Sequence, residues 1–181
     1  MKKIILILLC FVLLFAGCEQ LQKAEPYYTE TRDDITLKTQ YEYYFDDESN
    51  ILCVWNNESA EELYFHDTFE LHILGDDGEW YRVSKGEEVT FNTGYSHFVE
   101  PDTESNNRYE LSVYTKSLKE GETYRISTYC FDGNDNRYQI FAEFTCDNKL
   151  AEEEMKEVSG GYVGKRSDPE EGGSFEIIDG K

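Results

Sequence analysis

Cys18 is the cysteine whose position in the sequence indicates a specific chemistry, because it comes at the end of the longest apolar run of the chain. Two lysines open the sequence after Met1, and the residues from Ile4 to Ala16 are apolar without a break. A run of this length is typical of a signal-peptide core and is too short to span a bilayer. Small side chains, such as those of Ala16 and Gly17, fit the narrow pocket of a signal peptidase. The pattern predicts a cleavable leader that ends directly before a reactive thiol.

The stretch Phe15-Ala16-Gly17-Cys18 resembles the lipobox of bacterial lipoproteins, which reads roughly Leu-Ala-Gly-Cys, with phenylalanine where leucine is usual. The resemblance implies cleavage after Gly17 and attachment of a diacylglycerol to the Cys18 sulfur. Each buried methylene of a lipid chain contributes about 0.8 kcal/mol, so several acyl chains anchor a protein stably. We expect residues 1–17 to be a removed leader and Cys18 to tether the chain to the extracellular side of the cell membrane. An ordinary secretory signal is the alternative.

The chain is strongly acidic, with 17 basic and 38 acidic residues and a formal net charge of −21. Loss of the two leader lysines brings this charge to −23. Such a surface repels phosphate backbones and anionic lipid headgroups, which argues against nucleic acid or the headgroups themselves as partners.

The pattern of the chain divides it into four parts. After the leader, residues 18–33 are polar and predict a flexible tether, which could lift the domain about 50 Å from the membrane at roughly 3.3 Å per residue. Residues 34–147 contain short alternating apolar runs between turn signals, and aromatics make up 15% of the chain. These features favour an all-β fold of seven or eight antiparallel strands packed as a sandwich. Residues 148–181 form an acidic, Gly-rich tail, expected to be largely disordered beyond a helical turn or two.

Five segments of the 34–147 region carry a family resemblance, in this order: "NNESAEELYF", "DDGEWYRVS", "VEPDTES", "LKEGETYRIS" and "FAEFTC". Their succession resembles a bacterial immunoglobulin-like domain found in lipoproteins and cell-surface proteins of Gram-positive bacteria. The resemblance implies an immunoglobulin-like antiparallel β-sandwich.

Four residues are expected to carry the fold: Trp80, Tyr124, Ile126 and Phe144. Trp80 supplies a large apolar area near the middle of the chain. Tyr124 stands where immunoglobulin-like folds keep a tyrosine corner, in which the phenol bonds to a nearby backbone group. The alternative is that Tyr124 is an ordinary strand tyrosine.

Three cysteines remain besides Cys18 after removal of the leader, namely Cys53, Cys130 and Cys146. This odd number does not make a disulfide framework. The family resemblance allows a disulfide between Cys53 and Cys130 across the sandwich. The alternation around Cys53 leaves its direction open, since either Ile51, Cys53 and Trp55 or Leu52 and Val54 could face inward, and one residue of slip reverses every side chain.

Two groups of residues have the types needed for a metal site. Asp132, Asn134, Asn136 and Glu143 match the oxygen ligands of a calcium loop, but Arg137 stands where that loop needs glycine, so the segment predicts a hairpin turn. The three histidines, His66, His72 and His97, lack ligand spacing. We find no catalytic motif, and we expect neither a metal, nor a cofactor, nor an enzymatic reaction.

The sequence thus predicts a binding or scaffolding module at the cell envelope, whose partner is an unidentified envelope protein or glycan. One alternative is a carbohydrate-binding module that uses a platform of exposed tyrosines, for which the candidates are Tyr27, Tyr28, Tyr41, Tyr43 and Tyr44. Another alternative is an accessory or inhibitor domain of an envelope enzyme.

Overall fold

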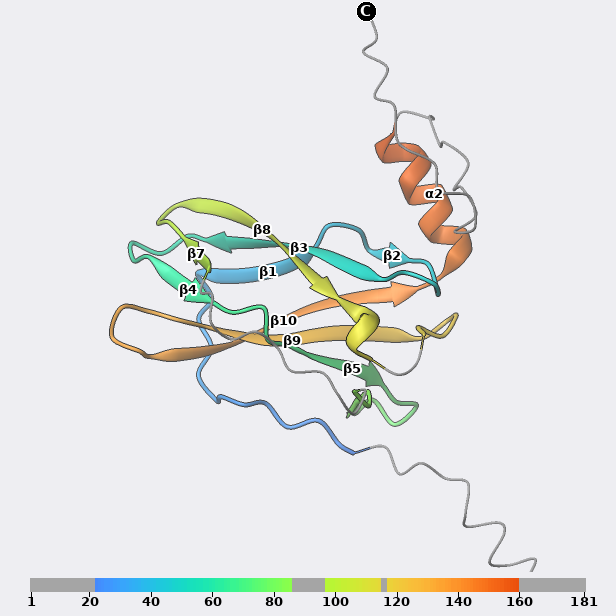
Figure 1. The fold of residues 1–181 in the computed structure, drawn as a ribbon, viewed down its shortest axis with the longest axis horizontal. Helices are drawn as coiled ribbons and strands as arrows, with labels where there is room; N and C mark the ends of the chain where they lie inside the picture. The colour runs from blue at the N-terminus through green and yellow to red at the C-terminus, as the bar shows by residue number, and fades with distance from the viewer. Residues whose placement is uncertain (1–21, 86–96, 115–116, 160–181) are drawn as a thin grey trace, which may run out of the picture.

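The computed structural model describes residues 22–85, 97–114 and 117–159, and these form a two-layered sandwich of strands (Figure 1). The strands are β1 (Ile35–Thr39), β2 (Tyr43–Tyr44), β3 (Asn50–Asn57), β4 (Leu63–Phe65), β5 (Glu70–Leu74), β6 (Trp80–Arg82), β7 (His97–Val99), β8 (Thr103–Glu110), β9 (Thr123–Phe131) and β10 (Arg137–Cys146). A 3₁₀ turn, η1 (Leu111–Val113), follows β8, and one helix, α2 (Asn148–Val158), follows β10. The predicted all-β sandwich is confirmed.

One layer contains three strands in the order β1-β3-β8, and the other contains seven (Figure 1). In the larger sheet, β9 pairs with β10 on one side and, at its two ends, with β4 and β5 on the other. The described residues contain ten strands rather than seven or eight, because β2, β4, β6 and β7 are pieces of two or three residues. The short pairing of β2 with β10 is parallel, which departs from the antiparallel expectation.

The inward direction of β3 is settled by burial. Ile51, Cys53 and Trp55 are at most 1% exposed, whereas Leu52 and Val54 are only partly covered. The first of the two registers left open by the sequence is therefore the one adopted. The same alternation on β9 and β10 buries Ile126 and Phe144, two of the residues expected to carry the fold.

Tyr124 ties the start of β9 to the loop before it. Its ring is 3% exposed and stacks on Phe144, with the ring centroids 5.7 Å apart. Its hydroxyl oxygen accepts a hydrogen bond from the Lys119 backbone N–H at 2.9 Å. This is the geometry of a tyrosine corner, in which a phenol holds the backbone a few residues upstream.

Replacing Tyr124 with phenylalanine is expected to lower the free energy of unfolding by about 1 kcal/mol, because the Lys119 amide loses its acceptor while the ring is kept. Urea unfolding would measure the change. Tyr41→Phe is the matched control, because within the described residues the hydroxyl of this partly buried tyrosine has no hydrogen bond. An equal loss in both variants would contradict a special role for Tyr124.

The helix α2 begins at a clear cap directly after β10 and projects away from that end of the sandwich (Figure 1). The Asp147 carboxylate accepts hydrogen bonds from the backbone N–H groups of Lys149 and Leu150. The Glu154 carboxylate accepts from the N–H groups of Glu42 and Tyr43, which satisfies donors at the start of β2. The helix is 11 residues long and so exceeds the turn or two predicted for this segment.

Candidate binding surface

The described chain begins with a segment that crosses the outer face of the larger sheet, and we call residues 22–30 the N-terminal strap. Its start pairs with β6. The Ala24 N–H donates to the Trp80 carbonyl, and the Gln22 carbonyl accepts from the Arg82 N–H, each at 2.8 Å. This pairing continues the sheet by a short strand-like piece beyond β6.

The end of the strap reaches β10, on the other side of the same sheet. There the Glu30 carbonyl accepts a hydrogen bond from the Gln139 N–H at 2.8 Å. In the described part of the segment predicted as a flexible tether, 18–33, the chain is thus bound to the sheet at both ends of the strap. The tether prediction rested on polarity and missed these bonds, because backbone groups make most of them and backbone groups leave no mark in the side-chain pattern.

Polar side chains of the sheet are buried beneath the strap, although they point to its outer face. His72 and Ser127 are 0% exposed and Gln139 is 2% exposed. The Gln139 side-chain oxygen accepts from the N–H groups of Tyr27 and Tyr28 at 3.0 and 3.3 Å, and its amide nitrogen donates to the Ser127 hydroxyl at 3.0 Å. Gln139 thus fixes the middle of the strap to the sheet.

A charged cluster lies where the strap passes β5 and β6. The Tyr27 hydroxyl donates to Glu70 at 2.5 Å, and the Arg82 and His72 side chains approach the same carboxylate within 3.2 and 3.1 Å. Arg125 Nε donates to His72 Nδ1 at 3.1 Å, so Nδ1 is an acceptor. The hydrogen-bond network therefore assigns the N–H of the His72 ring to Nε2, which faces Glu70. Burial alone would raise the pKa of Glu70, but the hydrogen bonds from His72 and Tyr27 outweigh it and lower that pKa. Both carboxylate oxygens are occupied, so the cluster fastens the strap and offers no free base.

Trp80, one of the residues expected to carry the fold, does not lie in the interior. It is partly exposed on β6, and the Arg125 guanidinium lies between its ring and that of Phe141, at 4.4 and 4.3 Å from the ring centroids. The tryptophan of the core is Trp55, which is 1% exposed and stacks on Phe65 at 4.7 Å. The alternation of β3 placed Trp55 inward, whereas β6 is too short and too close to an edge for burial.

Outward-facing rings form a continuous surface across β7, β4 and β9, which we call the aromatic row. Its members are Phe98, Tyr64, Phe131, His66, Tyr129 and Tyr28. Tyr64 lies directly opposite Phe98 on one side and Phe131 on the other. The Tyr64 and Phe131 rings are stacked at 5.6 Å, and the Tyr28 and Tyr129 rings meet edge-on at 5.0 Å. The row therefore begins at an edge strand and ends at the strap.

The aromatic row was missed by sequence reasoning, although a signal for it exists. In "LYF", "HFV" and "YCF" the positions that alternate with buried residues carry aromatics where a solvated sheet face usually carries polar side chains. Phe98 is 54% exposed and is among the most exposed large apolar side chains of the described residues. Because a single exposed aromatic needs no explanation, only the pairing of three strands shows that these rings adjoin one another.

A groove of about 420 Å³ adjoins the Tyr28 end of the row. It is lined by the strap and the β9–β10 turn through Tyr27, Tyr28, Thr29, Glu30, Asp135, Asn136 and Arg137. The Arg137 guanidinium donates to the Tyr28 hydroxyl at 2.7 Å and lies 5.9 Å from the centroid of the Tyr129 ring. Aromatic faces beside planar polar groups are a common arrangement in ligand-binding clefts.

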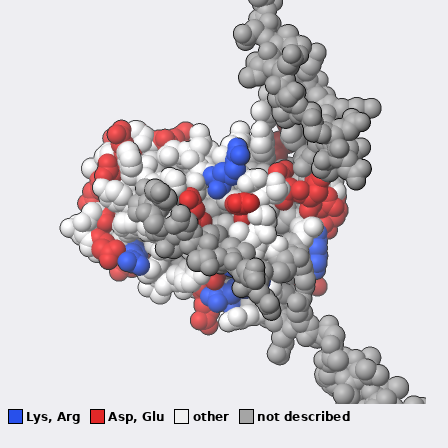
Figure 2. Space-filling view, in the orientation of Figure 1, with Lys and Arg blue, Asp and Glu red and all other residues white. Residues whose placement is uncertain are grey.

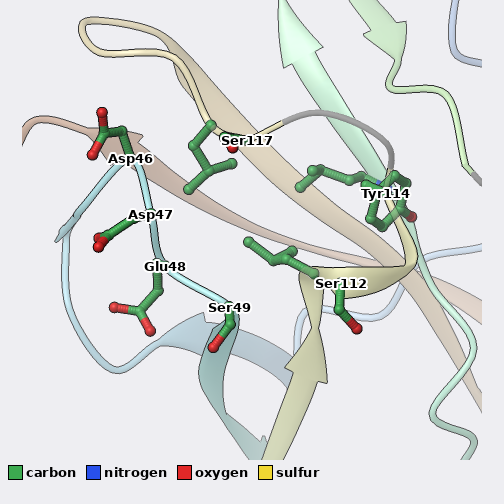
Figure 3. A pocket seen from close by; sticks show the side chains of 10 residues that line it. Asp46, Asp47, Glu48, Ser49, Ser112, Tyr114 and Ser117 are labelled. Carbon is green, nitrogen blue, oxygen red and sulfur yellow. Dashed lines mark hydrogen bonds between the residues drawn. The ribbon is translucent and has the colours of Figure 1, made fainter. Parts of the chain in front are cut away.

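A second hollow, of about 230 Å³, lies between the Asp46–Ser49 loop and the segment that follows β8 (Figure 3). Its floor is apolar, with Leu71, Leu111 and Leu118. The carboxylates of the loop point away from Tyr114 in Figure 3 rather than into the hollow. Within the described residues no cluster of three metal-binding side chains exists, here or elsewhere.

The five tyrosines proposed as a sugar platform are not brought together. Tyr27 and Tyr28 lie on the strap beside the groove, whereas Tyr41, Tyr43 and Tyr44 lie near α2, and Tyr44 is only 4% exposed. A single stacking platform made of these five rings is therefore excluded.

The segment considered for calcium is a hairpin turn, as the sequence favoured. Asp132 accepts hydrogen bonds from the N–H groups of Asn134 and Asn136 at 2.8 and 3.0 Å, so its oxygens are used within the turn. Their bonds lower the pKa of Asp132, the largest contribution coming from the Asn136 side chain. Glu143 lies on β10, exposed and away from this turn.

The three histidines occupy separate settings. His72 is in the buried cluster, the His97 ring is 3.0 Å from the Asp67 carboxylate, and the His66 ring packs near Phe131 at 5.3 Å. They do not form a site together.

The structure carries Cys53, Cys130 and Cys146 as buried free thiols, so the disulfide between Cys53 and Cys130 is not formed. Both side chains face the interior, as a cross-sandwich bond would need, but they lie at different levels of it. Cys53 neighbours Tyr109, whereas Cys130 lies close to Asp132 at the hairpin end of β9. A disulfide requires its two Cα atoms within about 7 Å.

Burial raises the pKa of each of these three thiols to about 12. In the chain from residue 18 with Cys18→Ala, none of them is expected to react with a thiol reagent at pH 8, and all three should react in urea. The pKa of each thiol in the folded protein exceeds the unfolded value of about 9. The free energy of unfolding therefore does not change with the titration of these thiols below pH 9, and it falls as the pH rises from 9 towards 12. Urea unfolding at pH 7 and pH 10.5 should show the lower stability at the higher pH. Rapid labelling of any of the three thiols in the folded protein would contradict the prediction.

Cys18, Gly17 and the apolar run lie outside the described residues, so the expected lipid site has no structural description here. Over residues 22–85, 97–114 and 117–159, no helix combines the length and apolar character needed to cross a bilayer. Acidic side chains are spread over the visible face of the molecule and basic ones are few, in accord with the net charge (Figure 2).

Comparison with solved structures finds distant likenesses. A structural genomics target, SoR45, superposes with a TM-score of 0.42 at 12% identity, covering 68% of this chain and 92% of that one. The archaellum periplasmic stator protein FlaG from Sulfolobus acidocaldarius gives 0.36 at 14% identity, with 61% and 99% covered. The putative ApaA protein from Bordetella pertussis gives 0.35 at 13% identity, with 67% and 99% covered. At these scores the likenesses carry no argument about function.

Comparison with curated proteins finds no match. The sequence model of the family described as "Bacterial Ig-like domain" matches residues 31–145, which is more than half of the chain and nearly the whole sandwich. Domains of this family are generally non-catalytic extracellular modules. The chain belongs to the bacterial Ig-like domain family.

Proposed function

We propose that this protein is a lipoprotein, anchored through Cys18 to the outer side of the cell membrane, whose Ig-like domain binds a component of the cell envelope through the aromatic row. The observation that carries the binding role is the row itself, a set of adjoining rings left on the solvent side of three neighbouring strands. The net negative charge of the chain disfavours nucleic acid as the ligand.

The anchoring part of the proposal is supported by the leader. Two lysines, an apolar run and the Phe15-Ala16-Gly17-Cys18 stretch stand in the order that a lipoprotein signal requires. In a bacterium grown with a labelled fatty acid, the wild-type chain should take up label and Cys18→Ser should not. An intact leader, or label that persists in Cys18→Ser, would contradict the anchor.

The binding part is supported by what aromatic surfaces do. Exposed rings that adjoin one another lose water readily, and partners use such rings as binding hot spots. A ring at the edge strand, such as Phe98, is reachable both for a flat partner and for an added strand.

Photo-crosslinking from within cells tests the binding part. A crosslinking residue in place of Phe98 on the row should give a discrete adduct, whereas the same residue in place of Tyr43 near α2 should not. Phe98→Ser with Tyr64→Ser should weaken binding of the adduct partner by about tenfold or more, as for hot-spot residues. Adducts from both positions, or from neither, would argue against the row. An adduct with an envelope enzyme would identify the domain as its accessory or inhibitor.

A second candidate function is carbohydrate binding, which the groove favours. It places Tyr27 and Tyr28 beside Asp135, Asn136 and Arg137, so a sugar could be met by rings and by planar polar groups together. On a glycan array, wild type and Tyr43→Ala should give the same signals, and Tyr28→Ala should lose them. Absence of any signal for the wild type would contradict carbohydrate binding and favour a protein partner.

A further inference from the structure

The strap is part of the folded domain and not a linker to it. Its bonds join β6 at one end and β10 at the other, and the side chains beneath it are closed to solvent. Lys23 adds an ion pair to Glu79 at 2.9 Å on the β5–β6 turn. Within the described residues, the hydrogen bonds between the strap and the sheet therefore begin at Gln22, whose carbonyl accepts from the Arg82 N–H.

Very little chain remains between this point and Cys18. Four Cα–Cα steps separate Cys18 from Gln22, and a fully extended chain spans at most about 3.6 Å per step, or about 14 Å in all. The polar stretch 18–33 on its own suggested a reach of about 50 Å. The docked strap removes most of that slack.

The anchored end and the aromatic row lie at opposite ends of the larger sheet. Arg82 of β6 stands opposite His72, and His72 stands opposite Arg125 near the start of β9. Phe131, in the row, is the last residue of the same strand. Six residues of strand at about 3.3 Å each place the two levels about 20 Å apart, which exceeds the remaining slack.

Charge repulsion sets the orientation of the domain relative to the membrane. A chain of net charge near −23 is repelled by anionic headgroups within a Debye length, about 8–10 Å. Only the β6 end is held by the anchor, so repulsion moves the rest of the domain outward.

We infer that the domain stands directly on the membrane, with β6 and the β5–β6 turn next to the lipid and the aromatic row facing away from it. This inference rests on the proposed anchor at Cys18 and deepens it. The row then meets a component of the layer outside the membrane, or of another cell, rather than a protein embedded in its own membrane.

Energy transfer on vesicles tests this orientation. The chain from Cys18 onward is coupled through its Cys18 thiol to a maleimide lipid, in phosphatidylcholine vesicles with phosphatidylglycerol and a headgroup acceptor dye. The other three thiols are buried, so coupling is directed to Cys18. A donor is attached by click chemistry to an alkyne residue at position 76, in the β5–β6 turn, or at position 134, in the β9–β10 turn; both native side chains are exposed.

Transfer is expected to be severalfold greater from position 76 than from position 134. A flexible Gly-Ser segment inserted between Leu21 and Gln22 should lower the transfer from 76 and remove the difference. Equal transfer from the two positions in the chain without the insertion, or no effect of the insertion, would overturn the inference. Since the lipid is attached chemically, a failure of the cell to acylate Cys18 would contradict the proposed function without altering this result.

Discussion

Trp55→Ala is expected to lower the free energy of unfolding by about 3–5 kcal/mol, the usual cost of removing a large ring from a packed core. Trp55 is 1% exposed, and its ring stacks on Phe65 between the two layers. A domain of this size has about 5–15 kcal/mol in total, so the variant should be marginally stable or unfolded at 37 °C. Urea unfolding followed by circular dichroism would measure the loss.

Trp80→Ala is the matched control for this prediction. Trp80 is partly exposed and packs on the Arg125 guanidinium, an interaction worth about 1 kcal/mol at such a site. If Trp80→Ala lowered the free energy of unfolding as much as Trp55→Ala, Trp80 would stabilise the fold as strongly as the buried Trp55, against the burial described above.

Gln139→Ala is expected to release the strap and to lower the free energy of unfolding by about 2–3 kcal/mol. The side chain is 2% exposed and bonds to two strap amides and to Ser127, so its removal leaves several covered polar groups without partners. Hydrogen exchange should accelerate at Ala24, whose N–H is protected by the pairing with β6.

The control for Gln139→Ala is Gln40→Ala, at an exposed glutamine whose backbone rather than side chain makes a hydrogen bond to Leu52. It should leave both stability and strap exchange unchanged. If Gln139→Ala kept the slow exchange of Ala24, the pairing of the strap with β6 would not depend on the Gln139 side chain, which would contradict the prediction.

The sandwich could be predicted because its information is local. Alternation on β9 and β10 sets one face of each strand towards an apolar interior, because side chains along a strand point to opposite faces with a period of two. Even so, alternation did not fix the direction of β3, because both of its faces are apolar, and packing against Phe65 selected the one that buries Trp55.

The candidate binding surface could not be predicted in the same way. The rings of the aromatic row come from four separate stretches of the chain, and only the pairing of β7, β4 and β9 and the docking of the strap make them adjoin. The tyrosines grouped by sequence proximity, such as Tyr28 and Tyr43, are instead parted to opposite ends of the domain. Distance along the chain is a poor guide to distance in an antiparallel sandwich, where contacts are mostly long-range.

By itself, the sequence determined the all-β class, the excess of negative charge and the hairpin turn at Asp132, since each follows from composition or from neighbours along the chain. Tertiary structure alone decided that residues 22–30 form a strap, that Cys53 and Cys130 stay apart, and that Trp55 rather than Trp80 fills the core. The physical reason is common to all three. Burial and backbone hydrogen bonding depend on which strands become neighbours, and that choice is made by the whole chain at once.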